Sequence, residues 1–202
     1  GVPVRLGNLT EVRLIALKQR GLIQPGMTSV LVVLEPGAVG CGIVAEGQVL
    51  RGAVEASSEL GQTWVISRGE CVRLEELTEW PHLRDRVRRL GGESPGSLSA
   101  FLMGSGEEIS AVRGELATDL GRALANLVFL IKPSHLWLTG SLVSQGGPFV
   151  ESLSTEIHGH LLPAFSKALT IETLDNGPES GVIGAGGLIL DLLFAAPVVR
   201  YF

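Results

Sequence analysis

The sequence feature that most limits the fold is a long helical pattern over residues 107–131. Its apolar residues share one helical face: Ile109, Val112, Leu116, Leu120, Leu124, Leu127, Val128 and Ile131. Pro133 ends the pattern because proline cannot continue a helix. Residues 135–139 then show the apolar run of a buried strand. A helix with one apolar face followed by a strand predicts that the helix packs on a β-sheet.

The rest of the pattern predicts strands first, and then helices that alternate with strands. Residues 28–34 form a continuous β-branched and leucine run, as in a central strand. Further strands are expected at 43–45, 48–51, 63–66 and 169–172, and helices at 10–20, 98–103, 149–162 and 184–194. This order indicates an α/β or α+β architecture, a mixed sheet with helices packed on it.

Composition excludes several classes of protein. Hydrophobic residues make up 45% and charged residues 18% of the 202 residues, which excludes wholesale disorder. A net charge of -5 gives no basic footprint, so we do not expect these residues to bind nucleic acid themselves. The two cysteines, Cys41 and Cys71, and the lack of a recognisable signal peptide at residues 1–6 fit a reduced cytoplasmic protein.

The apolar stretch 181–199 needs its own interpretation. Asp191 in its middle and Pro197 near its end argue against a membrane span. We therefore expect a buried helix and no membrane association. The mean hydropathy of the chain, +0.34, is high for a monomer. Part of the apolar surface is accordingly expected to contact a partner or a further domain.

Motifs for cofactor, metal or nucleophile chemistry are weak. Gly37, Gly40 and Gly42 are expected in a turn whose N–H groups could face an anion, but a strand follows where a dinucleotide-binding helix should begin. The histidines and Cys71 lack metal-ligand spacing, and no Gly-x-Ser-x-Gly motif occurs. We therefore expect no metal and no cofactor. Glu59 is either a solvated loop residue or an acceptor for two sugar hydroxyls.

Three groups of segments follow one another in a characteristic order. The first contains Gly37-x-x-Gly40-x-Gly42, Glu46-Gly47-Gln48-Val49-Leu50 and Ser58-Glu59-Leu60-Gly61. The second contains Leu120-Gly121, Ala125-Asn126-Leu127, Lys132-Pro133 and the strand up to Gly140, and the third is Gly181-Val182-Ile183-Gly184-Ala185. Together these segments resemble the ROK family, which groups sugar kinases with sugar-responsive transcriptional repressors.

The resemblance implies an actin-like ATPase (ribonuclease H-like) lobe. Residues 1–202 would form a single lobe, the second of the two that family members have. The first lobe, with its Asp-x-Gly-x-Thr phosphate loop, and any DNA-binding domain are expected outside these residues. The residue roles that the resemblance implies are sugar binding for Asn8, Glu59 and Gln62, a phosphate-loop remnant at Gly37, Gly40 and Gly42, and an adenosine-side turn remnant at Gly140.

Departures from the family pattern change the expected chemistry. Leu9 stands where family kinases carry the Asp that takes the sugar hydroxyl proton, and leucine cannot act as a general base. Gln62 replaces a zinc-binding His, and Cys71 alone remains of a cysteine cluster, although Glu75 or Glu76 could replace its carboxylate. We therefore expect no catalytic residue and no zinc.

Three hypotheses remain open from the sequence. The first is the sugar-sensing and dimerisation domain of a ROK-type repressor, without kinase activity, that meets DNA only through another domain. The second is a fragment of a degenerate ROK sugar kinase. The third is a purely structural oligomerisation domain. The expected partners are a small sugar or sugar phosphate and a second copy of the chain.

Overall fold

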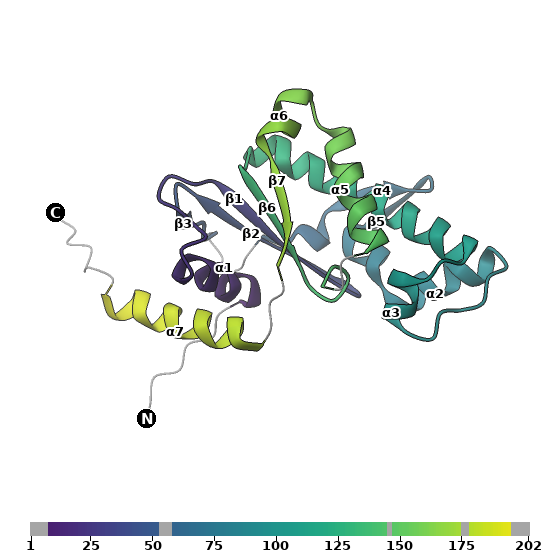
Figure 1. Cartoon of the computed structure of the whole chain (residues 1–202), viewed down its shortest axis with the longest axis horizontal. Coiled ribbons are helices and arrows are strands. Elements are labelled where there is room, and N and C mark those ends of the chain that lie inside the picture. Colours follow the sequence, from purple (N-terminus) through teal and green to yellow (C-terminus); the bar gives the residue numbers. More distant parts are fainter. Residues whose placement is uncertain (1–7, 53–57, 145–146, 175–177, 195–202) are drawn as a thin grey trace.

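A five-stranded mixed sheet lies at the centre of the molecule (Figure 1). The computed structural model describes residues 8–52, 58–144, 147–174 and 178–194, and of these it leaves out the side chains of 178–180 and 191–194. The strands lie in the order β3-β2-β1-β6-β7, with bounds β1 Ser29–Glu35, β2 Ala38–Ala45, β3 Gln48–Val49, β6 His135–Thr139 and β7 Thr170–Thr173. β1 pairs antiparallel with β2 and parallel with β6, and β6 pairs parallel with β7. The predicted mixed sheet is confirmed.

β1 is the central strand, as its apolar run predicts. Successive side chains of a strand point to opposite faces. Val30, Val32 and Leu34 accordingly belong to one apolar cluster and Leu31 to a second one. All four are fully buried, so both faces of the sheet are covered at this strand. A strand covered on both faces explains why the run is continuous rather than alternating.

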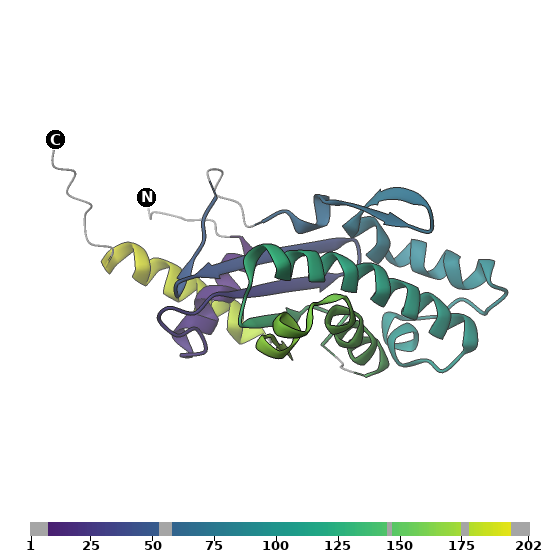
Figure 2. The ribbon, with the colours of Figure 1, turned by 90° about the horizontal axis from the view of Figure 1, so that it is seen from above.

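Helices cover the two faces of the sheet (Figures 1 and 2). On one face lie α1 (Leu9–Gln19) and α7 (Pro178–Phe194), which pack against each other. On the other lies the long helix α4 (Glu107–Ile131), with α5 (Pro148–His160) packed along it and α6 (Pro163–Ala168) following. The bounds predicted for α4 are confirmed. Its end is set by Lys132, which adopts the left-handed conformation at φ 55° before Pro133.

A smaller unit packs on α4 beyond the sheet. It comprises the 3-10 helices η1 (Leu60–Gln62) and η2 (Leu74–Thr78), the hairpin β4 (Trp64–Ser67) and β5 (Glu70–Arg73), and the helices α2 (Trp80–Arg89) and α3 (Leu98–Met103). Buried polar contacts attach it to α4. Ser67 Oγ donates to Asp119 Oδ2 at 2.5 Å, and Arg113 Nη1 donates to the carbonyls of Phe101, Leu102 and Gly104.

The turn predicted across Gly37, Gly40 and Gly42 is wrong for the last two glycines. Gly37, at φ 75°, lies in the turn, whereas β2 begins at Ala38 and contains Gly40 and Gly42. Both are glycine because α1 packs directly on them. A Cβ on Gly42 would lie 2.6 Å from Leu14 Cδ1. These glycines therefore serve helix–strand packing within the β1–β2 ladder.

The expectation of a buried final helix is only partly right. α7 begins at Pro178, earlier than predicted, and Leu188 is buried on the α1 side. Val182 is 75% exposed and Ile189 54% exposed, so the opposite face of α7 meets solvent. Within the part of the chain that the structure describes, no helix combines the length and apolar character needed to cross a membrane.

Candidate ligand-binding site

The carboxyl ends of β1 and β6 meet at one edge of the sheet, where parallel strands commonly place ligands. Glu35 ends β1, and its Oε2 accepts a hydrogen bond from the backbone N–H of Ser141 at 3.0 Å and another from the Ser141 hydroxyl. The N–H of Leu142 donates to the carbonyl of Leu34 at 3.2 Å. These bonds hold the turn after β6 against the end of β1.

Gly140 is required by this close approach. Its φ is 107°, a conformation that side-chain-bearing residues rarely adopt. A Cβ here would lie 2.3 Å from the carbonyl oxygen of Leu34. The structure thus gives Gly140 a packing role at the place where the sequence suggested the remnant of an adenosine-side turn, and the nucleotide role itself stays a prediction.

Arg13 adds a positive charge near Glu35. It lies on α1, and burial lowers the pKa of its guanidinium while the charge of Glu35 partly offsets that effect. Its Nη1 is buried and has no hydrogen-bond partner among the described residues. Neither Glu35 nor Arg13 belongs to a motif that the sequence singled out. The available signal was the position of Glu35 directly after the central apolar run, since strand ends commonly carry functional side chains.

The N–H of Gly37 is already engaged. It donates to Thr78 Oγ1 at 3.0 Å, and that hydroxyl donates in turn to the carbonyl of Glu75. Gly40 and Gly42 lie opposite Val33 and Leu31 in the sheet ladder. A turn of free N–H groups facing a phosphate is therefore absent from this described segment.

Asn8 and Leu9 stand at the start of α1. The side chain of Asn8 accepts a hydrogen bond from the N–H of Thr10 at 2.8 Å, so Asn8 caps the helix. Leu9 is the first helical residue and is 53% exposed. The next acidic residue, Glu11, pairs with Arg51 at 2.8 Å. The start of α1 thus presents a leucine at the position where the resemblance implies a carboxylate in kinases.

Glu59 lines a cavity of about 340 Å³ between β2, the residues around η1 and α4. Its carboxylate is exposed and does not cap η1. Trp64, which is 67% exposed, lines the same cavity. The other lining residues are Cys41, Ile43, Ser58, Leu60, Thr63, Val65, Ala123, Asn126, Leu127 and Leu130. The cavity therefore offers a carboxylate beside a broad apolar wall.

Of the three predicted sugar-binding residues, only Glu59 lines this cavity. Gln62 turns to its neighbours instead: its amide donates to Glu75 Oε1 at 2.6 Å and accepts from Arg73 Nη1 at 3.1 Å. Asn8 belongs to α1, whose Thr10 packs on Gly40 and Gly42, whereas the intervening Cys41 lines the cavity. Alternate residues of a strand face opposite sides, so α1 and the cavity lie on two faces of β2.

The cysteines and the possible metal ligands among the described residues are the next features that the sequence predictions concern. Among the residues that the structure describes, no three His, Cys, Asp or Glu side chains are grouped to hold a metal ion. Cys41 and Cys71 are free thiols, the first buried and the second exposed. Burial raises the pKa of Cys41 to about 12. Cys41 is therefore an inert part of the cavity wall at neutral pH.

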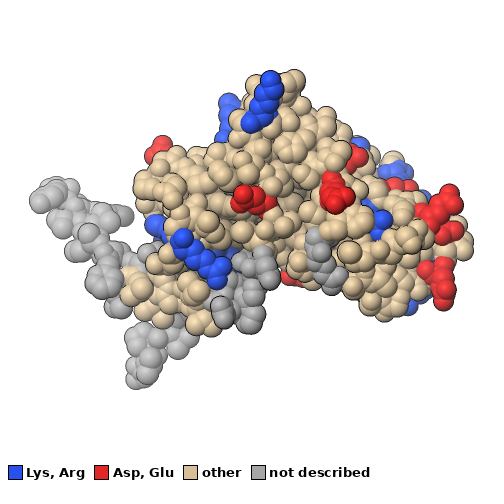
Figure 3. Space-filling view, in the orientation of Figure 1, with Lys and Arg blue, Asp and Glu red and all other residues tan. Residues whose placement is uncertain are grey.

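Charged side chains are scattered over the face shown in Figure 3, with wide uncharged areas between them. Within the described part of that face, the picture contains no continuous basic stripe of the kind that follows a phosphate backbone. That these residues do not bind DNA themselves stays a prediction.

β2 is antiparallel to both of its neighbours, β1 and β3, whereas β1, β6 and β7 are parallel to one another. A family model described as "ROK family" matches residues 1–191. The chain belongs to the ROK family. Its actin-like fold with a mixed sheet, expected from the sequence, is confirmed.

ROK relatives of this chain include both kinases and a regulator. The chain is 24% identical to a glucokinase of Halalkalibacterium halodurans, across 93% of its own length and 64% of that protein. A solved ROK family transcriptional regulator, a homologue of the E. coli MLC protein, has a TM-score of 0.78 at 23% identity, over 95% of this chain and 53% of that one. A ROK hexokinase from Thermus thermophilus has a TM-score of 0.73 at 22% identity, over 95% of this chain and 66% of that one. The chain thus spans a little over half to two thirds of these ROK proteins.

Proposed function

We propose that this chain is the sugar-sensing and dimerisation part of a ROK-type transcriptional repressor, without kinase activity. Residues 1–202 would be the second lobe of a longer protein that contacts DNA through a domain outside them. The effector would be a small sugar or a sugar phosphate. A sensor needs only different affinities of two protein states for its ligand, and it needs no chemistry.

Leu9 is the observation that carries the proposal against a kinase. A general base typically accelerates a reaction of this kind roughly 10²- to 10⁴-fold. Leu9 cannot accept a proton, and Glu11, the next carboxylate on α1, is held by Arg51. The described start of α1 therefore presents no free carboxylate to a sugar hydroxyl.

The cavity beside Glu59 supports sugar binding. An exposed carboxylate can accept hydrogen bonds from two neighbouring hydroxyls, and charged acceptors make stronger bonds than neutral ones. Trp64 provides a flat apolar surface on which the C–H face of a sugar ring can pack. In this proposal Glu59 binds the ligand directly, and Gln62 acts through its contacts with Arg73 and Glu75.

Calorimetry of the 202-residue chain with a panel of hexoses and hexose phosphates tests the sensing role. We expect saturable binding that the Glu59→Gln variant weakens at least tenfold. The matched control is Glu172→Gln, which neutralises an exposed carboxylate on β7, away from the cavity. Absence of saturable heat for every sugar would favour the purely structural oligomerisation domain instead. An equal loss in both variants would contradict the role given to Glu59.

A ROK sugar kinase is the second candidate, and the similarity to a glucokinase favours it. Incubation of the complete protein with ATP and each hexose distinguishes the two. The sensor proposal expects no hexose phosphate above the blank. Formation of hexose phosphate, lost on removal of ATP, would overturn it.

A further inference from the structure

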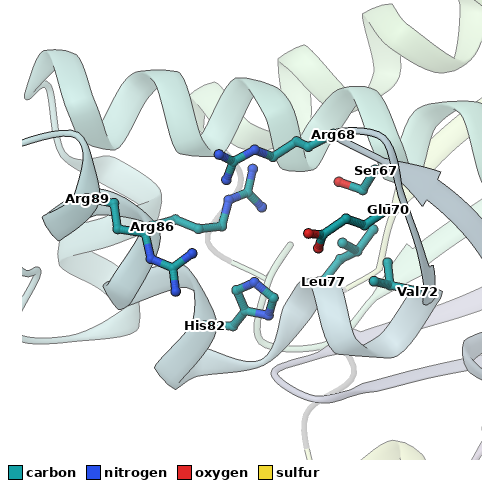
Figure 4. A pocket seen from close by; sticks show the side chains of 8 residues that line it. All are labelled: Ser67, Arg68, Glu70, Val72, Leu77, His82, Arg86 and Arg89. Carbon is teal, nitrogen blue, oxygen red and sulfur yellow. The ribbon is translucent and has the colours of Figure 1, made fainter.

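A basic pocket lies in the smaller unit, distinct from the Glu59 cavity. It has a volume of about 140 Å³ and lies between the β4–β5 hairpin and α2 (Figure 4). Its lining residues are Ser67, Arg68, Glu70, Val72, Leu77, His82, Arg86 and Arg89. The chain carries a net charge of -5, yet three guanidinium groups face a single carboxylate here.

Arg86 is a buried arginine in the wall of this pocket. Its side chain is only 3% exposed, and its buried Nε has no hydrogen-bond partner among the described residues. One N–H group, on Nη2, donates to Glu115 of α4, a carboxylate that is 46% exposed to water. A guanidinium carries five N–H donors, and buried donors without acceptors are costly. Arg86 therefore keeps a buried donor without an acceptor beside its positive charge.

Arg68 and Arg86 enter the pocket from opposite sides. Figure 4 shows Arg68 reaching in from the hairpin and Arg86 from α2, with the ring of His82 and the carboxylate of Glu70 at the same hollow. Arg68 occupies the tight hairpin turn at φ 53°, followed by Gly69 at φ 85°, so the backbone fixes where its side chain begins. The hydrogen bonds and ion pairs found among the described residues leave the guanidinium groups of Arg68 and Arg89 unpaired.

We propose that this pocket binds a phosphate group. A phosphate presents several strong acceptor oxygens in a tetrahedral arrangement and up to two negative charges, which match the forked donors and excess positive charge of the pocket. The volume of about 140 Å³ is several times the roughly 15 Å³ that one water needs, which leaves room for the five heavy atoms of a phosphate. Free inorganic phosphate and a sugar phosphate share this chemistry. The proposal does not depend on sugar sensing at Glu59.

The test measures binding to the 202-residue chain by calorimetry at fixed ionic strength, with inorganic phosphate, glucose 6-phosphate, glucose and chloride as separate probes. Arg68→Gln and Arg89→Gln remove exposed lining charges and leave the buried Arg86 in place. Arg88→Gln is the matched control, because Arg88 lies on the same helix, is exposed and pairs with Asp85 rather than lining the pocket.

We expect saturable binding of phosphate or glucose 6-phosphate, weakened at least tenfold in the two pocket variants and less than twofold in Arg88→Gln. Binding of both phosphate probes identifies free phosphate as sufficient, whereas binding of glucose 6-phosphate alone identifies a monoester. The proposal is overturned if neither probe binds more tightly than chloride. It is equally overturned if Arg88→Gln weakens binding as much as the pocket variants do, or if glucose competes for the same site.

Discussion

Glu35 accepts two hydrogen bonds from Ser141, a residue 106 positions away in the sequence. The pair joins the carboxyl ends of β1 and β6 at the edge where α/β sheets commonly bind ligands. The charge of Glu35 also raises the pKa of Arg13 and so partly offsets the lowering that burial causes. This edge of the sheet is therefore a fixed arrangement rather than a free loop.

Glu35→Gln should destabilise the fold. Hydrogen bonds to a charged acceptor contribute about 1.5–3 kcal/mol, and we expect a loss in that range of the free energy of unfolding, measured by urea denaturation. Ser141→Ala removes the hydroxyl but keeps the backbone N–H, so it should cost about 1 kcal/mol. Glu172→Gln, on the exposed surface of β7, serves as the control. Equal stabilities of Glu35→Gln and the control would contradict the role given to this pair.

Gly140→Ala, in the turn after β6, should strongly destabilise the fold. The added Cβ would meet the carbonyl oxygen of Leu34 at 2.3 Å in a backbone conformation that alanine avoids, so we expect a loss of at least about 2 kcal/mol. Gly69→Ala is the matched control. Gly69 also has a positive φ, of 85°, but a Cβ added there would have no atom within 4 Å, and about 1 kcal/mol is expected. Thermal unfolding of both variants would reveal whether the contact or the φ angle dominates.

The two thiols should differ in reactivity and in their effect on stability at high pH. Cys71 is exposed and should react with a thiol reagent in the native protein, whereas Cys41 should react only after unfolding. The folded pKa of Cys41, about 12, lies above the ordinary thiol value of 9.0. The folded protein therefore keeps its proton where the unfolded chain loses it, so stability falls as pH rises from 9 towards 12.

The slope of that fall is at most about 1.4 kcal/mol per pH unit for one group. Cys41→Ser lacks a thiol that titrates in this window, and comparison of its unfolding free energy with that of the unchanged chain at about pH 8 and pH 10 isolates the contribution of Cys41. Parallel pH dependence of the two proteins would show that Cys41 contributes nothing.

Exposed apolar residues of β4 and α4 should contribute to dimerisation. Ile66 is 68% exposed, Trp64 67% and Leu130 80%, and two of them also line the Glu59 cavity. Exposed apolar surface of this kind commonly marks an interface. We expect Ile66→Lys and Leu130→Lys to shift a dimer towards monomer in light scattering at equal concentration. Leu22→Lys, at a 46% exposed leucine elsewhere on the surface, should leave the mass unchanged.

Light scattering can also reject this assignment. A chain that is monomeric before any substitution, at high concentration, would contradict the dimer proposal. A dimer that neither Ile66→Lys nor Leu130→Lys weakens would place the interface elsewhere, for instance on the exposed face of α7 around Val182.

Local patterns are sufficient to predict much of the fold. The continuous run over 28–34 predicts the central strand because both faces of that strand are covered. The helical period of the apolar residues over 107–131 predicts α4 because these residues form its buried side. β5 has no such signal because its exposed residues Glu70, Cys71 and Arg73 show no apolar alternation. The turn expected at Gly40 and Gly42 is wrong. These positions are glycine because α1, from an earlier part of the sequence, packs directly on them.

Most of the candidate site residues could not be predicted from the sequence, for a similar reason. Glu59 could be singled out from its loop, but Glu35 and Ser141 are brought together only by the parallel pairing of β1 and β6. The phosphate pocket combines Arg68 of a hairpin turn with Arg86 and Arg89 of a helix whose sequence is merely charged and amphipathic. Contacts between distant segments carry no local signature.

α4 extends past both proposed binding places. Glu115 pairs with Arg86 at the phosphate pocket, Asp119 binds Ser67 of the hairpin, and Leu127 lines the Glu59 cavity. The span from residue 115 to residue 127 is about 18 Å along the helix axis. If both proposed ligands bind and one of them shifts this helix, linkage makes the effect of each ligand on the other's affinity equal in magnitude. The long helix is thus in contact with both the proposed phosphate pocket and the proposed sugar cavity.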